Sequence, residues 1–181
     1  MIKQVKYSIE IDIENGNNKR FRYYYKKTWD NTKPIITAIL LNPSKADLTF
    51  NDNTLDRLTT EFLNREYGGM VILNLFCLMD KFPNKLIYSE INKEIKNLRY
   101  IYNYINNNQK KDYFIGWSNS FNNIESDEIK ESARKKKKFI EDLFRKNNMK
   151  NQVYCYRYNG RKALHPSKYK IIWQYDKYFL R

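Results

Sequence analysis

The first stretch of the chain alternates apolar and polar side chains, a pattern typical of a half-buried β-strand. The alternation runs from Val5 to Ile13 and ends in a turn at Asn15-Gly16, after which the chain returns through the aromatic run Phe21 to Tyr25. Two such segments joined by Asn-Gly predict a β-hairpin. We expect residues 1–30 to form this hairpin as an appendage to the main sheet.

Further along the chain, continuous apolar runs replace the alternation, as expected of strands buried on both faces of a parallel sheet. Apolar residues recur at helical spacing between these runs. The predicted strands are 35–41, 70–76, 112–117 and 152–156, and the predicted helices are 53–65, 89–105 and 126–146. Strands that alternate with helices call for right-handed crossovers. Residues 1–181 are therefore predicted to be one α/β domain, with a three-layer α/β/α core over 35–170 built on a four-stranded parallel sheet.

The two longer predicted helices each have one apolar face, which we expect to pack on the sheet. In the helix that follows residue 89, this face is formed by Ile91, Ile95, Leu98, Tyr102 and Ile105. In the helix over 126–146, it is formed by Ile129, Ala133, Ile140, Leu143 and Phe144.

The chain is strongly basic, with 34 Lys and Arg against 20 Asp and Glu and a formal charge of +14. Part of this excess reflects a general abundance of Lys, Asn, Ile and Tyr. The remainder favours a polyanionic partner, and nucleic acid is the first candidate. A run of four lysines at 135–138 must face solvent in part, so Lys135 and Lys136 are candidates for phosphate contacts. The alternative is a solvated helix face without a partner.

Cysteine is scarce, since only Cys77 and Cys155 occur, each inside an apolar run. They can form neither a disulfide framework nor a zinc or iron–sulfur site, so we expect no metal and no cofactor. The first residues have no apolar signal core, and no apolar run approaches the length of a membrane span. These features predict a soluble, cytoplasmic protein, which we expect to be a monomer without membrane contact.

Polar residues follow each predicted strand of the core. Asn42 ends the first, Asn74 lies in the second, Trp117-Ser118-Asn119 end the third, and the only histidine, His165, follows the fourth. The carboxyl ends of parallel strands meet at one edge of a sheet, where ligands bind. Proline follows both Asn42 and His165 and restricts their backbone. We therefore expect these groups to line a single cleft.

These motifs resemble those of the uracil-DNA glycosylase superfamily over residues 35–169. Leu40 to Ser44 is similar to the Gly-x-(Asp/Asn/Glu)-Pro motif after the first strand of that family, and Val71 to Phe76 is similar to its strand ending in a base-reading asparagine. Gly116-Trp117-Ser118 and His165 to Tyr169 are similar to two later motifs. The overall pattern is most similar to a bacterial and phage family known only as a domain of unknown function.

The chain also departs from the glycosylase pattern. Leu40 replaces the motif glycine, the cluster cysteines of one branch are missing, and no phenylalanine stands where the best-studied branch stacks one on the base. Phe50 or Phe76 would have to substitute. Ser44 replaces a bulky tyrosine, which implies a pocket open to a 5-substituted pyrimidine.

The resemblance implies a DNA glycosylase-like enzyme that hydrolyses the N-glycosidic bond of a flipped pyrimidine. Asn42 would hold the water, His165 would stabilise the departing base, and Asn74 would pair with its edge. An amide cannot accept the water's proton. An enzyme that relies on Asn42 would therefore have a slow turnover or need help from Asp47 or Asp52 in taking up that proton. The residues expected to contact DNA are Ser167, Lys168 and Tyr169, of which the last two are candidates for a duplex wedge.

Other readings of the same residues stay open. Asn42 could be a turn-stabilising amide, His165 an ordinary turn histidine, and Asn74 a buried amide satisfied by neighbouring backbone. At the level of the whole chain, one alternative is a nucleic-acid-binding module that has lost hydrolysis, such as a phage or host-defence protein. Another is a hydrolase of free modified nucleotides.

Overall fold

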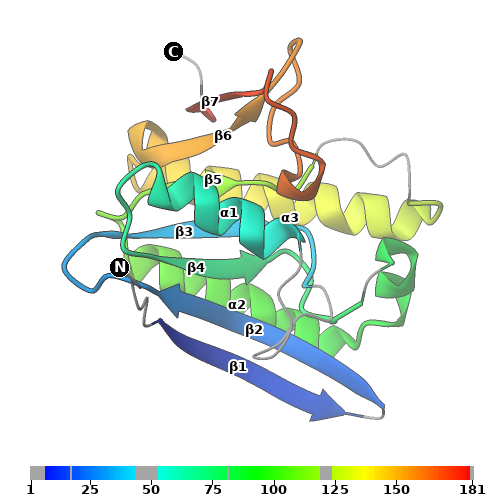
Figure 1. Ribbon diagram of the computed structural model, residues 1–181. Helices are drawn as coiled ribbons and strands as arrows, with labels where there is room; N and C mark the ends of the chain where they lie inside the picture. Colours follow the sequence, from blue (N-terminus) through cyan, green and yellow to red (C-terminus); the bar gives the residue numbers. More distant parts are fainter. Residues whose placement is uncertain (1–6, 17, 44–52, 81, 119–123, 180–181) are drawn as a thin grey trace.

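A seven-stranded mixed sheet runs through the molecule in the order β1-β2-β4-β3-β5-β6-β7 (Figure 1). The structure is a computed structural model that describes residues 7–16, 18–43, 53–80, 82–118 and 124–179. The strands are β1 (Ser8–Gly16), β2 (Lys19–Thr28), β3 (Ile35–Leu40), β4 (Gly69–Asn74), β5 (Tyr113–Ile115), β6 (Val153–Arg157) and β7 (Gln174–Lys177). The helices are α1 (Asn53–Leu63), α2 (Ile91–Asn107) and α3 (Asp127–Lys146), with 3-10 turns η1 (Pro83–Tyr88), η2 (Lys150–Gln152) and η3 (Pro166–Lys168).

The four predicted core strands are present and run parallel to one another in the order β4-β3-β5-β6. The expectation of a four-stranded parallel sheet is nevertheless wrong. The hairpin is part of the sheet, because β2 pairs with β4 in antiparallel fashion, with Tyr25 opposite Ile72. The segment after His165 adds β7 antiparallel to β6, with Asp176 opposite Cys155.

Burial explains why the hairpin joins the sheet. Phe21, Tyr23 and Tyr25 of β2 are fully buried, and an isolated hairpin has no second layer to cover such side chains. Pairing with β4 supplies that cover. β7 was not predicted because its sequence, Gln-Tyr-Asp-Lys, contains no apolar run. Its position is set by pairing with β6.

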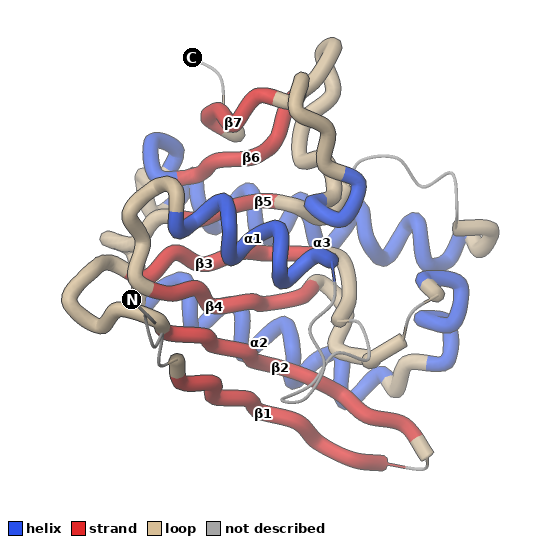
Figure 2. The backbone as a smooth tube through the Cα atoms, viewed as in Figure 1, coloured by secondary structure: helices blue, strands red, loops and turns tan. Residues whose placement is uncertain are grey.

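Helices cover both faces of the sheet, with α1 on one face and α2 and α3 on the other (Figures 1 and 2). The connection from β3 to β4 steps in one direction across the sheet, and the connections from β4 to β5 and from β5 to β6 step in the other. Right-handed crossovers then place α1 opposite to α2 and α3. Side chains of β3 alternate between the two cores: Ala38 and Leu40 join Leu58 of α1, whereas Ile39 joins Ile140 of α3.

Helix α3 buries the predicted face, from Ile129 to Phe144, whereas the face predicted for α2 is wrong except at its end, where Ile105 is buried as expected. The buried residues of α2 are Glu94, Asn97, Ile101 and Ile105. Ile91 is 71% exposed, and Ile95 and Tyr102 are exposed as well. A polar cluster beneath the end of β4 accounts for this rotation, because it gives Glu94 and Asn97 hydrogen-bond partners inside the molecule. Among the described helices, none has the length and apolar character needed to cross a bilayer.

Candidate functional site

The carboxyl ends of β3 and β4 are joined beyond the regular strand pairing. The Leu75 backbone N–H donates to the Leu40 carbonyl at 2.9 Å, and the Phe76 N–H donates to the Leu41 carbonyl at 2.9 Å. Leu40 lies opposite Asn74 in the parallel register. The two strand ends that carry Asn42 and Asn74 are therefore fixed side by side at one edge of the sheet.

Asn42 uses its amide nitrogen to hold this edge together. Its Nδ2 donates to the Asp80 carbonyl at 2.7 Å and to the Pro43 carbonyl at 3.3 Å, and the Asp80 N–H donates to the Pro43 carbonyl at 3.1 Å. The turn after β3 is thus tied to the segment after β4. Because the nitrogen is engaged, the side-chain carbonyl oxygen is the atom of Asn42 that can orient a water.

Asn74 is the most unusual residue of the edge. It is 1% exposed, and neither Nδ2 nor Oδ1 has a hydrogen-bond partner within the described part of the chain. In the unfolded chain, water would hydrogen-bond to these atoms. Burying a polar atom without a partner therefore costs about 1–3 kcal/mol of stability. The reading in which neighbouring backbone satisfies this side chain therefore fails. A buried amide without a partner calls for an explanation, and a bound ligand or water that pairs with both of its atoms is one.

The side chain of Asn74 belongs to the α1 face of the sheet. Met70 and Ile72 of β4 pack in the cluster that contains α1, whereas Val71, Leu73 and Leu75 pack in the cluster that contains α2 and α3. Because side chains alternate along a strand, Asn74 follows Met70 and Ile72. Phe76 does not share this face, since it packs at 4% exposure in the other cluster. The prediction that Phe76 stacks on a base is therefore not supported by its position.

Three polar side chains from α2 and α3 support the end of β4 from the opposite face. The Asn97 Nδ2 donates to the Asn74 carbonyl at 2.9 Å and to the Leu75 carbonyl at 3.3 Å. The Lys136 Nζ donates to the Leu75 carbonyl at 2.9 Å and forms an ion pair with Glu94. Glu94 also accepts from the Cys77 N–H at 3.1 Å. The backbone around Asn74 is thus held in place by a buried network.

This network changes the role expected of the lysine run. Lys136 is 6% exposed and is paired with Glu94, so the prediction that it contacts a phosphate is corrected: it is a core residue. The side chain of Lys135 is 76% exposed and lies 3.6 Å from Glu131. Lys135 thus keeps the solvent-facing position expected of it.

The end of β5 brings the His165 turn against this edge. The Gly116 N–H donates to the Ile39 carbonyl at 3.0 Å, and the Ser118 N–H donates to the Ala163 carbonyl at 2.8 Å. A Cβ atom at position 116 would lie 2.9 Å from Leu40 Cδ2 and 3.0 Å from Pro166 Cδ. Only glycine lets Pro166 approach β3 this closely.

Trp117 and Lys137 flank the same strand end from the α3 side. Trp117 is fully buried, and its Nε1 has no hydrogen-bond partner within the described residues. The Lys137 amine donates to the Ser118 carbonyl. Burial lowers the pKa of Lys137 to about 8. A further buried polar atom without a partner among the described residues thus lies one residue after Gly116.

His165 begins η3 as its N-cap residue. Its Nδ1 lies 2.9 Å from the Ser167 Oγ and accepts from the Ser167 N–H at 3.4 Å. An Nδ1 that accepts a hydrogen bond favours the neutral tautomer with its proton on Nε2. His165 is half-buried, and in this tautomer its Nε2 carries the donor proton.

The residues after His165 differ in exposure and in the side-chain contacts they make. Ser167 and Lys168 are exposed, as expected of residues that contact DNA. Tyr169 is held in place, because the Arg57 guanidinium of α1 lies 3.2 Å above its ring and Trp173 packs edge-on at 6.1 Å. Its ring is therefore not a free wedge.

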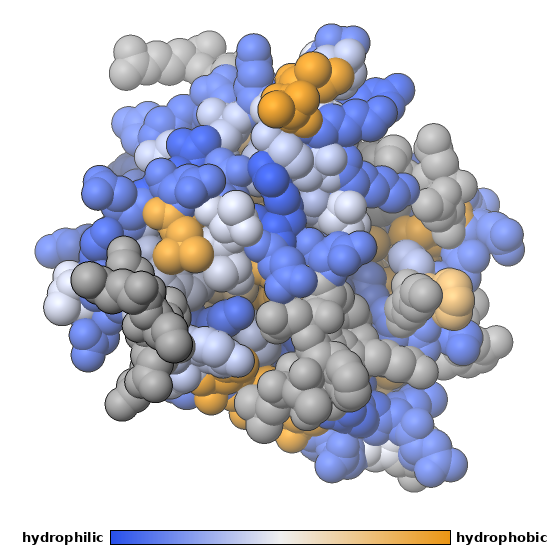
Figure 3. Space-filling view, in the orientation of Figure 1, coloured by the Kyte–Doolittle hydropathy of each residue, from blue (hydrophilic) through white to orange (hydrophobic). Residues whose placement is uncertain are grey.

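Two isoleucines in the same loop were missed from the sequence. Ile171 is 90% exposed and Ile172 is 53% exposed. A small hydrophobic patch stands out from a mainly hydrophilic surface near the top of Figure 3, where the chain approaches β7. The available signal was an apolar pair within an otherwise basic segment, Lys-Tyr-Lys-Ile-Ile.

Several predicted residues lie outside the described part of the chain: Ser44, Asp47, Phe50, Asp52 and Asn119. Within the described residues, no three His, Cys, Asp or Glu side chains are grouped so that they could hold a metal ion.

Comparison with known protein families matches residues 22–167 to a family whose description is "Protein of unknown function (DUF1643)". No curated protein and no solved structure gives a significant match to the chain.

Proposed function

Because the chain belongs to the DUF1643 family, whose description names no activity, we propose a function from the site itself. The protein is a DNA glycosylase-like enzyme that hydrolyses the N-glycosidic bond of a flipped pyrimidine base. One observation carries the proposal: the buried side-chain amide of Asn74 has no partner within the described residues, at the carboxyl end of the parallel core strands of the mixed sheet, where ligands bind.

The chemistry of the Asn74 amide matches the edge of a pyrimidine. The amide offers one acceptor oxygen and a nitrogen with two donor protons. A uracil-like or thymine-like edge presents a carbonyl acceptor beside an N–H donor, so a flipped base satisfies both atoms of Asn74 at once. A base with the wrong pattern leaves buried polar atoms unpaired, which discriminates strongly.

His165 and Asn42 suit the two other tasks of the reaction. Breaking the bond to the sugar leaves an oxocarbenium-like sugar and negative charge on the departing base. A neutral His165 with its proton on Nε2 donates a hydrogen bond to the base oxygen as this charge develops. The Asn42 carbonyl orients the attacking water but cannot take its proton, which makes the hydrolysis slow.

The order of the motifs adds support. Asn42-Pro43 follows β3, Asn74 ends β4 and His165-Pro166 comes after β6, in the order of the uracil-DNA glycosylase motifs that these residues resemble. The wedge of this enzyme is then assigned to Ile171 and Ile172, since exposed apolar side chains next to lysines suit insertion between base steps.

Base release tests the proposal directly. Oligonucleotides with uracil, thymine or 5-substituted pyrimidines are incubated with the protein, and abasic sites are detected by alkaline cleavage. We expect strand cleavage with the native protein and a loss of about 100-fold or more with Asn74→Ala, because each orphaned donor or acceptor contributes on the scale of an oxyanion-hole donor. Asn103→Ala, which changes an exposed asparagine of α2, is the matched control and keeps its activity. The absence of abasic sites on every substrate, modified phage DNA included, would refute the proposed activity.

A second candidate is a binding module of the same fold that does not hydrolyse. The Asn42 Nδ2 donates hydrogen bonds to the carbonyls of Asp80 and Pro43. These bonds favour the binding module, because a turn with a purely structural role needs them as well. Such a module binds modified DNA through Asn74 and releases no base. A hydrolase of free nucleotides is the third reading, and it predicts a shallow salt dependence of DNA binding.

A further inference from the structure

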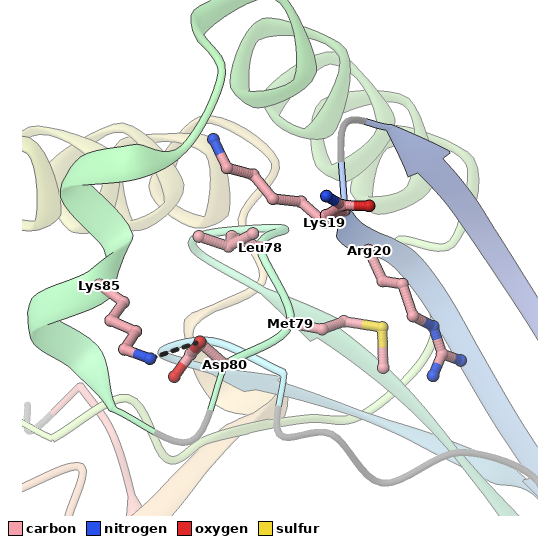
Figure 4. A pocket seen from close by; sticks show the side chains of 7 residues that line it. Lys19, Arg20, Leu78, Met79, Asp80 and Lys85 are labelled. Atoms are coloured by element: carbon pink, nitrogen blue, oxygen red, sulfur yellow. Dashed lines mark ion pairs between the residues drawn. The ribbon is translucent and has the colours of Figure 1, made fainter.

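A pocket of about 460 Å³ opens beside the Asn42 turn, between the start of β2 and the segment that leads from β4 to η1 (Figure 4). Its size lies within the range of small-molecule sites, about 300–1,000 Å³. The residues that line it are Asn18, Lys19, Arg20, Leu78, Met79, Asp80 and Lys85.

The backbone makes the walls of this pocket rigid. The Met79 N–H donates to the Arg20 carbonyl at 2.8 Å, and Phe21 forms an antiparallel bridge with Leu78. The sheet therefore continues through both walls. The pocket is a cleft built between paired segments and not a space between independent loops.

The lining combines an apolar floor with a cationic rim. Leu78 and Met79 are each 5% exposed, whereas Lys85 and Arg20 extend toward solvent. Among the described lining residues, Lys19, Arg20 and Lys85 are basic and Asp80 is acidic. The Lys85 amine points toward Asp80 (Figure 4) but stays 4.0 Å away, with the lysine side chain 56% exposed. An exposed pair at that distance is weak, so Lys85 is able to turn to an anion.

One wall of the pocket is shared with the candidate site. The Asp80 carbonyl accepts the hydrogen bond from the Asn42 Nδ2 at 2.7 Å, and the Asp80 N–H donates to the Pro43 carbonyl. A ligand that contacts the Asp80 side chain is thus one residue away from the turn that carries Asn42. The pocket and the Asn42 turn are therefore linked through the Asp80 backbone.

We propose that this pocket binds one nucleotide unit, with its phosphate on Lys19, Arg20 and Lys85 and its base or sugar on Leu78 and Met79. The cationic rim selects an anion, and the apolar floor with its volume selects something larger than inorganic phosphate. Because Asp80 of this pocket is hydrogen-bonded to the Asn42 turn, we take the unit to be a neighbour of the target base in the same strand. The choice of strand rests on the proposed function; a free nucleotide presents the same chemistry.

The test measures binding and does not depend on catalysis. A fluorescein-labelled 12-nucleotide single strand is titrated with the native protein and with the double variant Arg20→Glu, Lys85→Glu, at several salt concentrations. The matched control is the double variant Lys110→Glu, Lys150→Glu. It reverses the charge of two exposed lysines that lie just before the amino ends of β5 and β6. Melting temperatures check that all variants fold. Thymidine monophosphate is added as a competitor to test the second source of the ligand.

We expect the pocket variant to bind the strand at least about 10-fold more weakly than the control, and its salt slope to fall by about 0.7 for each lost phosphate contact. If only competition by the free monophosphate is lost, the pocket binds nucleotides from solution. Equal binding of both ligands by the pocket and control variants would overturn the proposal. If the pocket variant loses binding but no base is ever released, the pocket stands and the proposed activity alone fails.

Discussion

The amide of Asn97 in α2 donates a 2.9 Å hydrogen bond to the backbone carbonyl of Asn74, from the face of the sheet opposite to the Asn74 side chain. The proposed base-reading residue is thus positioned through its own main chain. Its side chain stays available because the support comes from behind. This separation of support and recognition lets a buried amide remain unpaired without losing its orientation.

Replacing Asn97 tests this support. Asn97→Leu keeps the approximate volume but removes the donor, so the Asn74 carbonyl loses its side-chain partner. We expect the free energy of unfolding to fall by about 1–3 kcal/mol and pyrimidine binding to weaken as well. Urea denaturation and oligonucleotide titration measure the two effects. Unchanged affinity in a destabilised Asn97→Leu protein would mean that Asn97 is structural only.

The buried pair of Glu94 and Lys136 is expected to show strong coupling. Lys136→Met leaves the Glu94 carboxylate buried without its cation, which costs about 3–5 kcal/mol. In the double variant Glu94→Gln, Lys136→Met no charge remains, so we expect much of this loss to be recovered. Chemical denaturation of the two single variants and the double variant completes the cycle. Additive losses would show that the two side chains do not interact energetically.

The same pair shows where sequence reasoning succeeds and where it fails. The strand that ends in Asn74 could be predicted because its apolar run is local. The buried face of α2 could not, since Glu94 is neutralised by Lys136, 42 residues away, and a helical pattern contains no such partner. Likewise, nothing local shows that Arg57 holds Tyr169. Charge compensation between distant elements decides these positions, whereas hydrophobic periodicity decides the core strands.

Gly116 is expected to be sensitive to a single methyl group. In Gly116→Ala, the new Cβ would contact Leu40 Cδ2 at 2.9 Å and Pro166 Cδ at 3.0 Å, which pushes the His165 turn away from β3. Overpacking of this kind costs about 1–3 kcal/mol of stability. We expect the rate of base release to fall by more than the fraction of unfolded protein accounts for. The matched control is Gly16→Ala, where the nearest atom would be 3.7 Å away. Equal effects of the two substitutions on base release would contradict the role given to Gly116.

The hairpin is expected to loosen in acid. Lys93, Lys96 and Tyr23 donate hydrogen bonds to Glu14 and lower the pKa of its carboxyl to about 2, from 4.5. A lowered pKa in the folded state contributes stability that is complete above pH 4.5 and is lost as the pH falls toward 2. Glu14→Gln lacks this dependence. We therefore expect the stability difference between the native protein and Glu14→Gln to shrink steadily from pH 4.5 to pH 2, as followed by thermal unfolding. A constant difference across this range would show that Glu14 is not coupled to folding.

Ile171 and Ile172 are expected to matter for duplex DNA and not for single strands. If they part the base steps beside a flipped pyrimidine, the variant Ile171→Ser, Ile172→Ser loses the unstacking that a duplex requires, and a single strand needs none. We expect the affinity for a duplex with one modified pyrimidine to fall about 10-fold or more, corresponding to at least about 1.4 kcal/mol. The control is Ile91→Ser, which removes an isoleucine that is 71% exposed on α2. Anisotropy titrations with matched single- and double-stranded oligonucleotides measure both affinities. Equal losses on both substrates would identify the two isoleucines as a general contact surface, and no loss on either would remove them from the DNA interface.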